Sequence, residues 1–193
     1  MASLPIAVHP MKPSGCCGVR TATPEDAAAV LECARETFRT SMFTLTQADE
    51  FTMTLDQERA FLADTLAHPD QAFLIAVDAD LPHRPPEPGE VLGALVMRQT
   101  TPKRKVRHIV DLGMSVRSSH RSRGVGTALM TEAVRWAESR PELSIITLAV
   151  YAANAHARAL YRRFGFIQYG MFPDGCKHDD GTTWDQIHMY RRV

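Results

Sequence analysis

The chain carries two patterns of apolar residues, one typical of helices and one typical of strands. Apolar side chains that recur every three or four positions fall on one face of a helix, and short apolar runs indicate buried strands. The first pattern predicts helices over residues 23–38, 54–66, 124–139 and 154–164. The second predicts strands over residues 18–21, 72–77, 91–98, 108–116, 144–150, 166–172 and 184–191. This order, without an internal repeat, predicts a mixed α/β (α+β) fold with helices packed on a mixed sheet.

Capping residues and turn residues mark the ends of these elements. Thr23 and Pro24 suit the start of the first helix, and Thr54 with Gln57 forms a capping-box pattern before the second. Gly165 follows the last helix, where a glycine commonly ends the helical hydrogen bonding. Residues 81–90 hold four prolines and a glycine, which predicts a loop.

Length and composition favour a single soluble domain. The 193 residues suit one hydrophobic core, and 45% hydrophobic with 23% charged residues is ordinary for a globular protein. Residues 1–17 hold several prolines without periodicity, which predicts a flexible N-terminal arm before a domain over residues 18–193. No apolar run approaches the length of a membrane span, and residues 1–9 lack the basic start of a signal peptide.

The charge balance and the cysteines argue against two kinds of binding. Lys plus Arg and Asp plus Glu both number 22, so the basic excess typical of nucleic-acid binding is missing. The cysteines at positions 16, 17, 33 and 176 match neither a disulfide framework nor a zinc site, and no two histidines have HxxxH spacing. We therefore expect no metal site. Free thiols fit the reducing cytosol, which predicts a cytoplasmic protein.

The segment from Arg121 to Thr127 carries the clearest chemistry. It lies where a turn meets the start of a predicted helix, whose unpaired N–H groups and positive dipole end attract anions. Gly124 and Gly126 let the backbone approach a phosphate, and Arg121 and Arg123 add positive charge. A Walker loop is excluded because no Lys follows Gly126, and the dinucleotide fingerprint is excluded because position 129 is leucine.

A second motif follows one strand later. Asn154 begins a helix that runs to Gly165 and Phe166. With the Arg121–Gly126 loop, this segment resembles the GNAT superfamily of N-acetyltransferases, which pairs an Arg/Gln-x-x-Gly-x-Gly/Ala loop with an Asn-x-x-Ala-x-x-Leu/Phe-Tyr-x-x-x-Gly-Phe helix. The matching positions in this helix are Asn154, Ala157, Leu160, Tyr161, Gly165 and Phe166. The resemblance covers roughly residues 18–193, and it implies a mostly antiparallel sheet flanked by helices and acetyl-CoA as the acyl donor.

By this resemblance, the backbone of the loop would cradle the pyrophosphate of acetyl-CoA. The residues concerned are Arg121, Ser122, Arg123, Gly124, Val125, Gly126 and Thr127. The preceding strand would splay from its neighbour and bind the pantetheine arm through Met114, Ser115 and Val116. A main-chain N–H near Met114 would stabilise the oxyanion. The amine would attack directly in a ternary complex, so no cysteine is assigned the role of nucleophile.

Three residues are candidates for proton transfer. The resemblance implies that Tyr161 protonates the departing sulfur, and a phenol and a thiol have similar pKa values. Asp111 is the candidate base, because many relatives hold a Glu at the similar place in a run like His108–Gly113; the shorter Asp would act through water. His108 is the alternative base, because the ordinary pKa of a histidine suits proton transfer near neutral pH. Asn154 either orients the cofactor or a water, or caps its helix.

The acceptor stays open. The leading hypothesis is acetyl transfer to a primary amine of a small molecule or peptide, and a protein N-terminal or lysine acetyltransferase would share the same cofactor site. A non-catalytic acyl-CoA sensor is the third hypothesis, against which Tyr161 and the intact loop argue. Residues 38–54 and the late strands would build the acceptor groove. Dimers are common among such folds, although no residue pattern here demands a homodimer.

Overall fold

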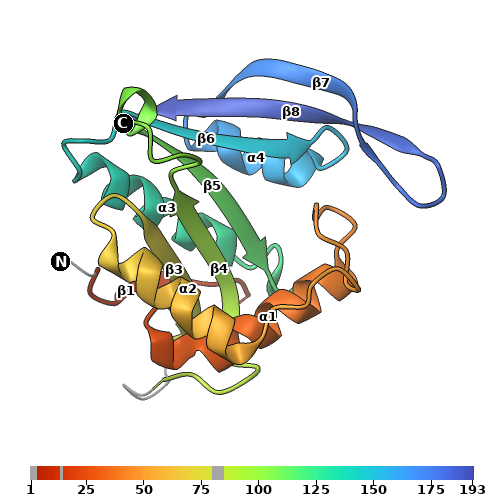
Figure 1. Cartoon of the computed structure of the whole chain (residues 1–193). Helices are drawn as coiled ribbons and strands as arrows, with labels where there is room; N and C mark the ends of the chain where they lie inside the picture. Colours follow the sequence, from red (N-terminus) through yellow and green to blue (C-terminus); the bar gives the residue numbers. More distant parts are fainter. Residues whose placement is uncertain (1–3, 14, 80–84) are drawn as a thin grey trace.

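The computed structural model describes residues 4–13, 15–79 and 85–193, and in these residues the strands form one sheet (Figure 1). The strands are β1 (Ala7–Pro10), β2 (Cys16–Thr21), β3 (Ala72–Asp78), β4 (Val91–Arg98), β5 (Ile109–Val116), β6 (Ile145–Tyr151), β7 (Ile167–Lys177) and β8 (Thr183–Arg192). Their order is β1-β2-β3-β4-β5-β6-β8-β7, and every neighbouring pair is antiparallel except β5 with β6. The predicted mixed, mostly antiparallel sheet is confirmed.

Helices cover both faces of this sheet. The α-helices are α1 (Ala27–Thr40), α2 (Leu55–Ala67), α3 (Val125–Glu138) and α4 (Ala155–Arg163), and the short 3-10 turns are η1 (Pro24–Asp26), η2 (Arg104–Val106) and η3 (Ser118–His120). Phe73, Ile75 and Val77 of β3 join the core under α1 and α2, whereas Leu74 and Ala76 join the core under α3 and α4. Because side chains alternate along a strand, β3 serves both cores and needs an unbroken apolar run. No helix in the described ranges is long and apolar enough to cross a membrane.

The structure corrects the N-terminal prediction. The sequence places residues 1–17 in a flexible arm, yet Ala7–Pro10 form β1 and pair with β2 at the edge of the sheet. The predicted flexible arm is therefore wrong for residues 7–10, which form β1. Four residues are too short to show a clear period, and their hydrogen bonds depend on the free edge of β2. The predicted loop over residues 81–90 lies partly outside the described residues, and its described part contains no helix or strand.

Strands β5 and β6 separate along their length, and this positions the candidate site. They pair only over Ile109–Asp111 and Ile145–Thr147. Beyond that point β5 continues with β4 as far as Val116, and β6 continues with β8 as far as Tyr151. The backbone groups of residues 112–116 that face β6 therefore have no partner in that strand, and a backbone edge of this kind can bind an extended ligand.

Candidate active site

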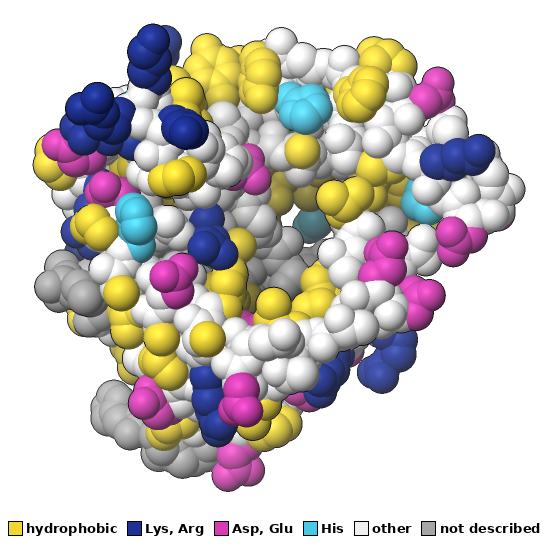
Figure 2. Space-filling view, in the orientation of Figure 1, with side chains coloured by type: hydrophobic (Ala, Val, Ile, Leu, Met, Phe, Trp, Pro, Cys, Tyr) yellow, Lys and Arg dark blue, Asp and Glu magenta, His cyan; other side chains and the backbone are white. Residues whose placement is uncertain are grey.

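A cavity of about 610 Å³ opens where β5 and β6 separate. Figure 2 shows this face of the molecule hollowed, with hydrophobic side chains around the opening. Met114 on its wall packs with the α3 and α4 core, whereas Phe61 and Phe73 on its wall belong to the α1 and α2 core. The cavity thus joins the two faces of the sheet. The predicted site residues on its wall are Asp111, Met114, Ser115, Asn154 and Tyr161.

Tyr161 lies on α4 and reaches the cavity from the side of α3 and α4. Its side chain is only 7% exposed, and its ring packs against Phe166 with the ring centroids 5.9 Å apart. Burial raises the pKa of the phenol to about 12 because the charged form loses its hydration. The hydroxyl therefore keeps its proton at neutral pH and can donate it to a group inside the cavity.

Asp111 lies on β5 and faces the opposite side of the sheet. Thr147 Oγ1 of β6 donates a hydrogen bond of 2.9 Å to Asp111 Oδ1. The surrounding protein raises the pKa of this carboxyl, although the bond from Thr147 and the nearby His188 partly offset the rise. The side chain remains accessible from the cavity. His108, the alternative base, precedes β5 at the end where β5 and β6 are still paired, and it does not line the cavity.

A second carboxyl on the cavity wall, Glu58 of α2, escapes the sequence analysis. It is only 4% exposed, and no described residue donates a hydrogen bond to its carboxylate or forms an ion pair with it. Burial alone raises its pKa to about 7. Glu58 shares the buried stripe of α2 with Leu62 and Thr65. A charged residue on a buried stripe is the sequence signal that could have identified it.

The loop after β5 offers backbone amides to an anion. Ser122 has a φ of 59° and Gly124 a φ of 103°, and this left-handed backbone turns the chain from η3 into α3. Helix α3 begins at Val125, so the amides of Val125, Gly126 and Thr127 belong to its first turn and have no partner within the helix. These amides and the helix dipole form a site suited to a phosphate.

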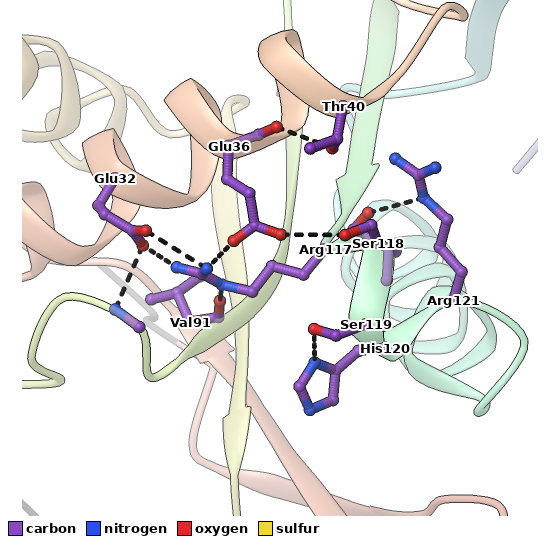
Figure 3. Close-up of polar contacts among 11 residues, drawn as sticks. Glu32, Glu36, Thr40, Val91, Arg117, Ser118, Ser119, His120 and Arg121 are labelled. Atoms are coloured by element: carbon purple, nitrogen blue, oxygen red, sulfur yellow. Dashed lines mark hydrogen bonds and ion pairs between the residues drawn. The ribbon is translucent and has the colours of Figure 1, made fainter.

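Two arginines of this loop have different surroundings (Figure 3). Arg117 is 6% exposed, and its guanidinium forms ion pairs with Glu32 and Glu36 of α1. Arg121 is exposed, and its Nε donates to the backbone oxygen of Val116 at 3.2 Å. Arg117 therefore ties the loop to α1, a role that the sequence analysis does not foresee. Arg121 remains accessible to a bound phosphate.

The segment that follows β1 supports the loop from its other side. The Lys12 amide donates to the Arg123 carbonyl at 2.8 Å, and Arg123 Nε donates to the Lys12 carbonyl at 2.9 Å. A Cβ at position 124 would lie 3.2 Å from the Pro10 oxygen, so Gly124 permits this close packing as well as the left-handed turn. The N-terminal residues thus contribute to the shape of the candidate phosphate site.

Asn154 and Val116 complete the predicted set. Asn154 Oδ1 accepts a hydrogen bond of 3.1 Å from the Ala157 amide, so this side chain caps α4, which is one of its two predicted alternatives. It also lines the cavity, whereas Val116 does not. Within the described ranges, no group of three or more His, Cys, Asp or Glu side chains could hold a metal ion.

The outer wall of the cavity brings together segments that are distant in sequence. Residues 41–54, between α1 and α2, meet the β7–β8 hairpin through aromatic contacts. The Trp184 ring lies 5.6 Å from Phe43 and 5.4 Å from Tyr151, measured between centroids. Gln47 Nε2 also donates to Asp179 Oδ1 at 3.3 Å. These are the segments that the sequence analysis expects around the acceptor.

Comparison with known proteins agrees with this architecture. The sequence model of the acetyltransferase (GNAT) family matches residues 31–166. The chain is 35% identical over 79 residues to the L-amino acid N-acetyltransferase AaaT of Escherichia coli K12, and this match covers 40% of the chain and 48% of that protein. The chain thus spans about half the length of this curated relative.

Solved structures share the fold over most of the chain. An acetyltransferase of the GNAT family from Streptococcus pneumoniae has a TM-score of 0.83 at 25% identity, over 92% of this chain and 99% of that one. A phosphinothricin acetyltransferase from Sinorhizobium meliloti in complex with acetyl-CoA has a TM-score of 0.77 at 19% identity, over 92% of this chain and 88% of that one. The resemblance noted in the sequence is confirmed.

Proposed function

Because the chain belongs to the GNAT acetyltransferase family, we propose that it transfers the acetyl group of acetyl-CoA to a primary amine of a small molecule or peptide. The amine attacks the thioester directly while both substrates are bound. The observation that carries this proposal is the cavity between β5 and β6, whose wall includes the Asp111 carboxyl from one face of the sheet and the Tyr161 phenol from the other. The reaction needs a proton acceptor and a proton donor, since the amine loses a proton and the departing sulfur gains one, and these two groups can fill those roles.

The loop and the β5 edge suit the acyl donor. The first-turn amides of α3 and the side chains of Arg121 and Arg123 offer hydrogen bonds and positive charge to a pyrophosphate. The edge of β5 from Met114 to Val116 suits the amide groups of an extended pantetheine arm. A main-chain N–H near Met114 would stabilise the negative charge on the thioester oxygen. The acetyl-CoA complex of the S. meliloti protein supports this choice of donor.

Asp111 and Tyr161 divide the proton transfers. Asp111 accepts, through a water, the proton that the amine loses as its nitrogen bonds to the acetyl carbon. Tyr161 donates its proton to the sulfur as the carbon–sulfur bond breaks, so that CoA leaves as a thiol. The products are an amide and CoA, and the two residues return to their starting protonation by exchange with solvent.

The size of the cavity and the curated relative favour a small acceptor. About 610 Å³ lies within the range typical of small-molecule sites. The E. coli protein, which is similar over 79 residues, is named as an acetyltransferase of L-amino acids. Both observations support a small amine rather than the terminus or a lysine of a folded protein.

The test follows CoA release from acetyl-CoA with a panel of primary amines. We expect Tyr161→Phe to lower kcat by roughly tenfold or more, because the acid is lost, and to leave acetyl-CoA binding unchanged. Tyr169→Phe is the matched control, since Tyr169 lies on β7 with 59% of its surface exposed. Binding of acetyl-CoA without turnover of any amine would favour the sensor hypothesis. Failure to bind acetyl-CoA would contradict the proposal.

A further inference from the structure

The acceptor side of the cavity is strongly aromatic. The Phe38 and Phe51 rings pack with centroids 4.6 Å apart, and the Phe61 and Phe73 rings pack edge to face with centroids 5.9 Å apart. All four rings line the cavity on the side of α1 and α2, together with Met53. Such a wall favours an apolar group, because its burial removes apolar surface from water at both partners.

The charges on this wall are acidic. Among the described residues that line the cavity, Glu58 and Asp111 are the charged ones, and no Lys, Arg or His accompanies them. Arg35 of α1 and Arg98 of β4 have other contacts, and His188 of β8 lies near Asp111 without lining the cavity. Arg35 donates to the Met53 carbonyl at 3.3 Å, and Arg98 donates to Gln71 at 2.8 Å while it covers the ring of Phe61.

This distribution of charge discriminates between two classes of amine. An α-amino acid brings a carboxylate, and a buried carboxylate needs an Arg, a Lys or several N–H donors to replace its hydration. Here the lining offers the side-chain amides of Asn154 and Gln186 but no Lys or Arg, and the carboxylate would lie beside two further carboxyls. A simple amine brings only an ammonium group, for which a carboxylate is the matching partner.

We infer that the preferred acceptor is an apolar primary amine without a carboxylate, of the arylalkyl or alkyl type, and that Glu58 binds its ammonium group. This inference rests on the proposed acetyl transfer. Glu58 is buried on the cavity wall without a partner among the described residues, so a bound ammonium would supply the opposite charge that the protein does not. The bound ammonium first releases one proton to solvent, so that the neutral amine attacks, and Asp111 accepts the second proton as the nitrogen bonds to the acetyl carbon.

Matched pairs of acceptors test the substrate class. 2-Phenylethylamine is compared with L-phenylalanine, and 3-methylbutylamine with L-leucine, so that each pair differs by the carboxylate alone. We expect kcat/KM to be at least about tenfold higher for the simple amine in both pairs. Equal or better use of the amino acids, or turnover of peptides or polyamines alone, would overturn the inference and leave the proposed function intact. No turnover of any amine would overturn both.

The role of Glu58 is tested by Glu58→Gln, which keeps the shape of the side chain and removes its charge. We expect KM for 2-phenylethylamine to rise roughly tenfold, with less than about a threefold change in kcat and no change in acetyl-CoA binding. Asp56→Asn, on the same helix with a side chain 93% exposed, is the control and should leave KM unchanged. An unaltered KM in folded Glu58→Gln, or an equal loss in kcat, would rule out the binding role.

Discussion

The two halves of the cavity are built in different ways. The half expected to bind acetyl-CoA uses residues 114–127 and the Tyr161 helix, and most of its contacts would be made by the backbone. The half expected to bind the acceptor takes side chains from α1, α2, β3 and residues 41–54. A donor that is common to many reactions can be held largely by one contiguous segment with one neighbouring helix. A specific acceptor requires side chains brought together from distant segments, so a short motif identifies the donor alone.

The halves also differ in charge, and one residue joins them. The loop carries the exposed Arg121 and the half-buried Arg123, whereas two carboxyls line the acceptor side. Arg117 belongs to the loop but pairs with Glu32 and Glu36 of α1, and its Nε donates to the Val91 oxygen at 2.6 Å. We call these contacts of Arg117 the junction. If the junction affects the binding of both substrates, the two halves are not independent.

The largest effect is expected for Arg117→Met. Removing the buried Arg117 guanidinium leaves the half-buried Glu36 and the more exposed Glu32 without their counter-charge, which costs roughly 3 kcal/mol and lowers Tm by roughly 6–12 °C in a chain of this size. Because the loop and α1 lose their link, affinity for both acetyl-CoA and the amine should fall. Thermal unfolding and separate titrations of the two substrates measure these effects.

A compensating change serves as the control for the junction. Glu36→Gln added to Arg117→Met removes one of the uncompensated carboxylates and should restore part of the lost Tm. Loss of acetyl-CoA affinity alone, with amine KM and Tm unchanged, would show that the two halves are independent.

The same contrast explains what the sequence could and could not predict. The helix around Tyr161 and the turn at Gly124 have local causes, namely helical periodicity and a left-handed backbone, so the sequence locates both. Arg117 and Arg121 stand in one short polar run of the sequence. Arg117 has a structural role only because α1 packs close to it, whereas Arg121 stays exposed.

Glu58 and β1 depend on distant partners in the same way. Glu58 stands in the first turn of α2, where an acidic residue is ordinarily explained by the helix dipole. Its place on the stripe of Leu62 and Thr65 is a signal in the sequence, but its position on the cavity wall follows only from the packing of α2. Strand β1 exists because β2 offers a free edge. The separation of β5 from β6 likewise follows from pairing, which an apolar run does not encode, and only the family resemblance predicts it.

The second largest effect is expected on the stability of the chain when the buried Glu58 is replaced by Gln. The pKa of Glu58 is about 7 in the folded chain against an ordinary value of 4.5, so the folded state binds the proton more tightly than the unfolded state. This carboxyl therefore favours folding at low pH, and stability falls as the pH rises from about 4.5 to about 7. At pH 8 Glu58→Gln should be more stable by roughly 1–3 kcal/mol, which raises Tm by roughly 2–12 °C.

Thermal unfolding at two pH values checks the sign of this effect. The advantage of Glu58→Gln over the wild type should be full at pH 8 and should shrink at pH 5, where the wild-type carboxyl is protonated in the folded state. Asp56→Asn should show no such difference. A variant that is less stable than the wild type at pH 8 would mean that Glu58 has a stabilising partner. The acceptor half would then not contain an unpaired carboxylate that lowers the stability of the fold.

The smallest effect is expected for Arg121→Met, which affects the donor half alone. Arg121 is exposed, so its loss should change Tm by no more than about 1–2 °C. It should raise Kd for acetyl-CoA by roughly threefold to tenfold, since one charge near the phosphates is removed, and this difference should shrink at high salt as the charges are screened. Arg104→Met, in η2, is the matched control. An equal effect of both substitutions would indicate general attraction by positive charge, whereas an effect of Arg121→Met on amine KM would mean that the loop also shapes the acceptor half.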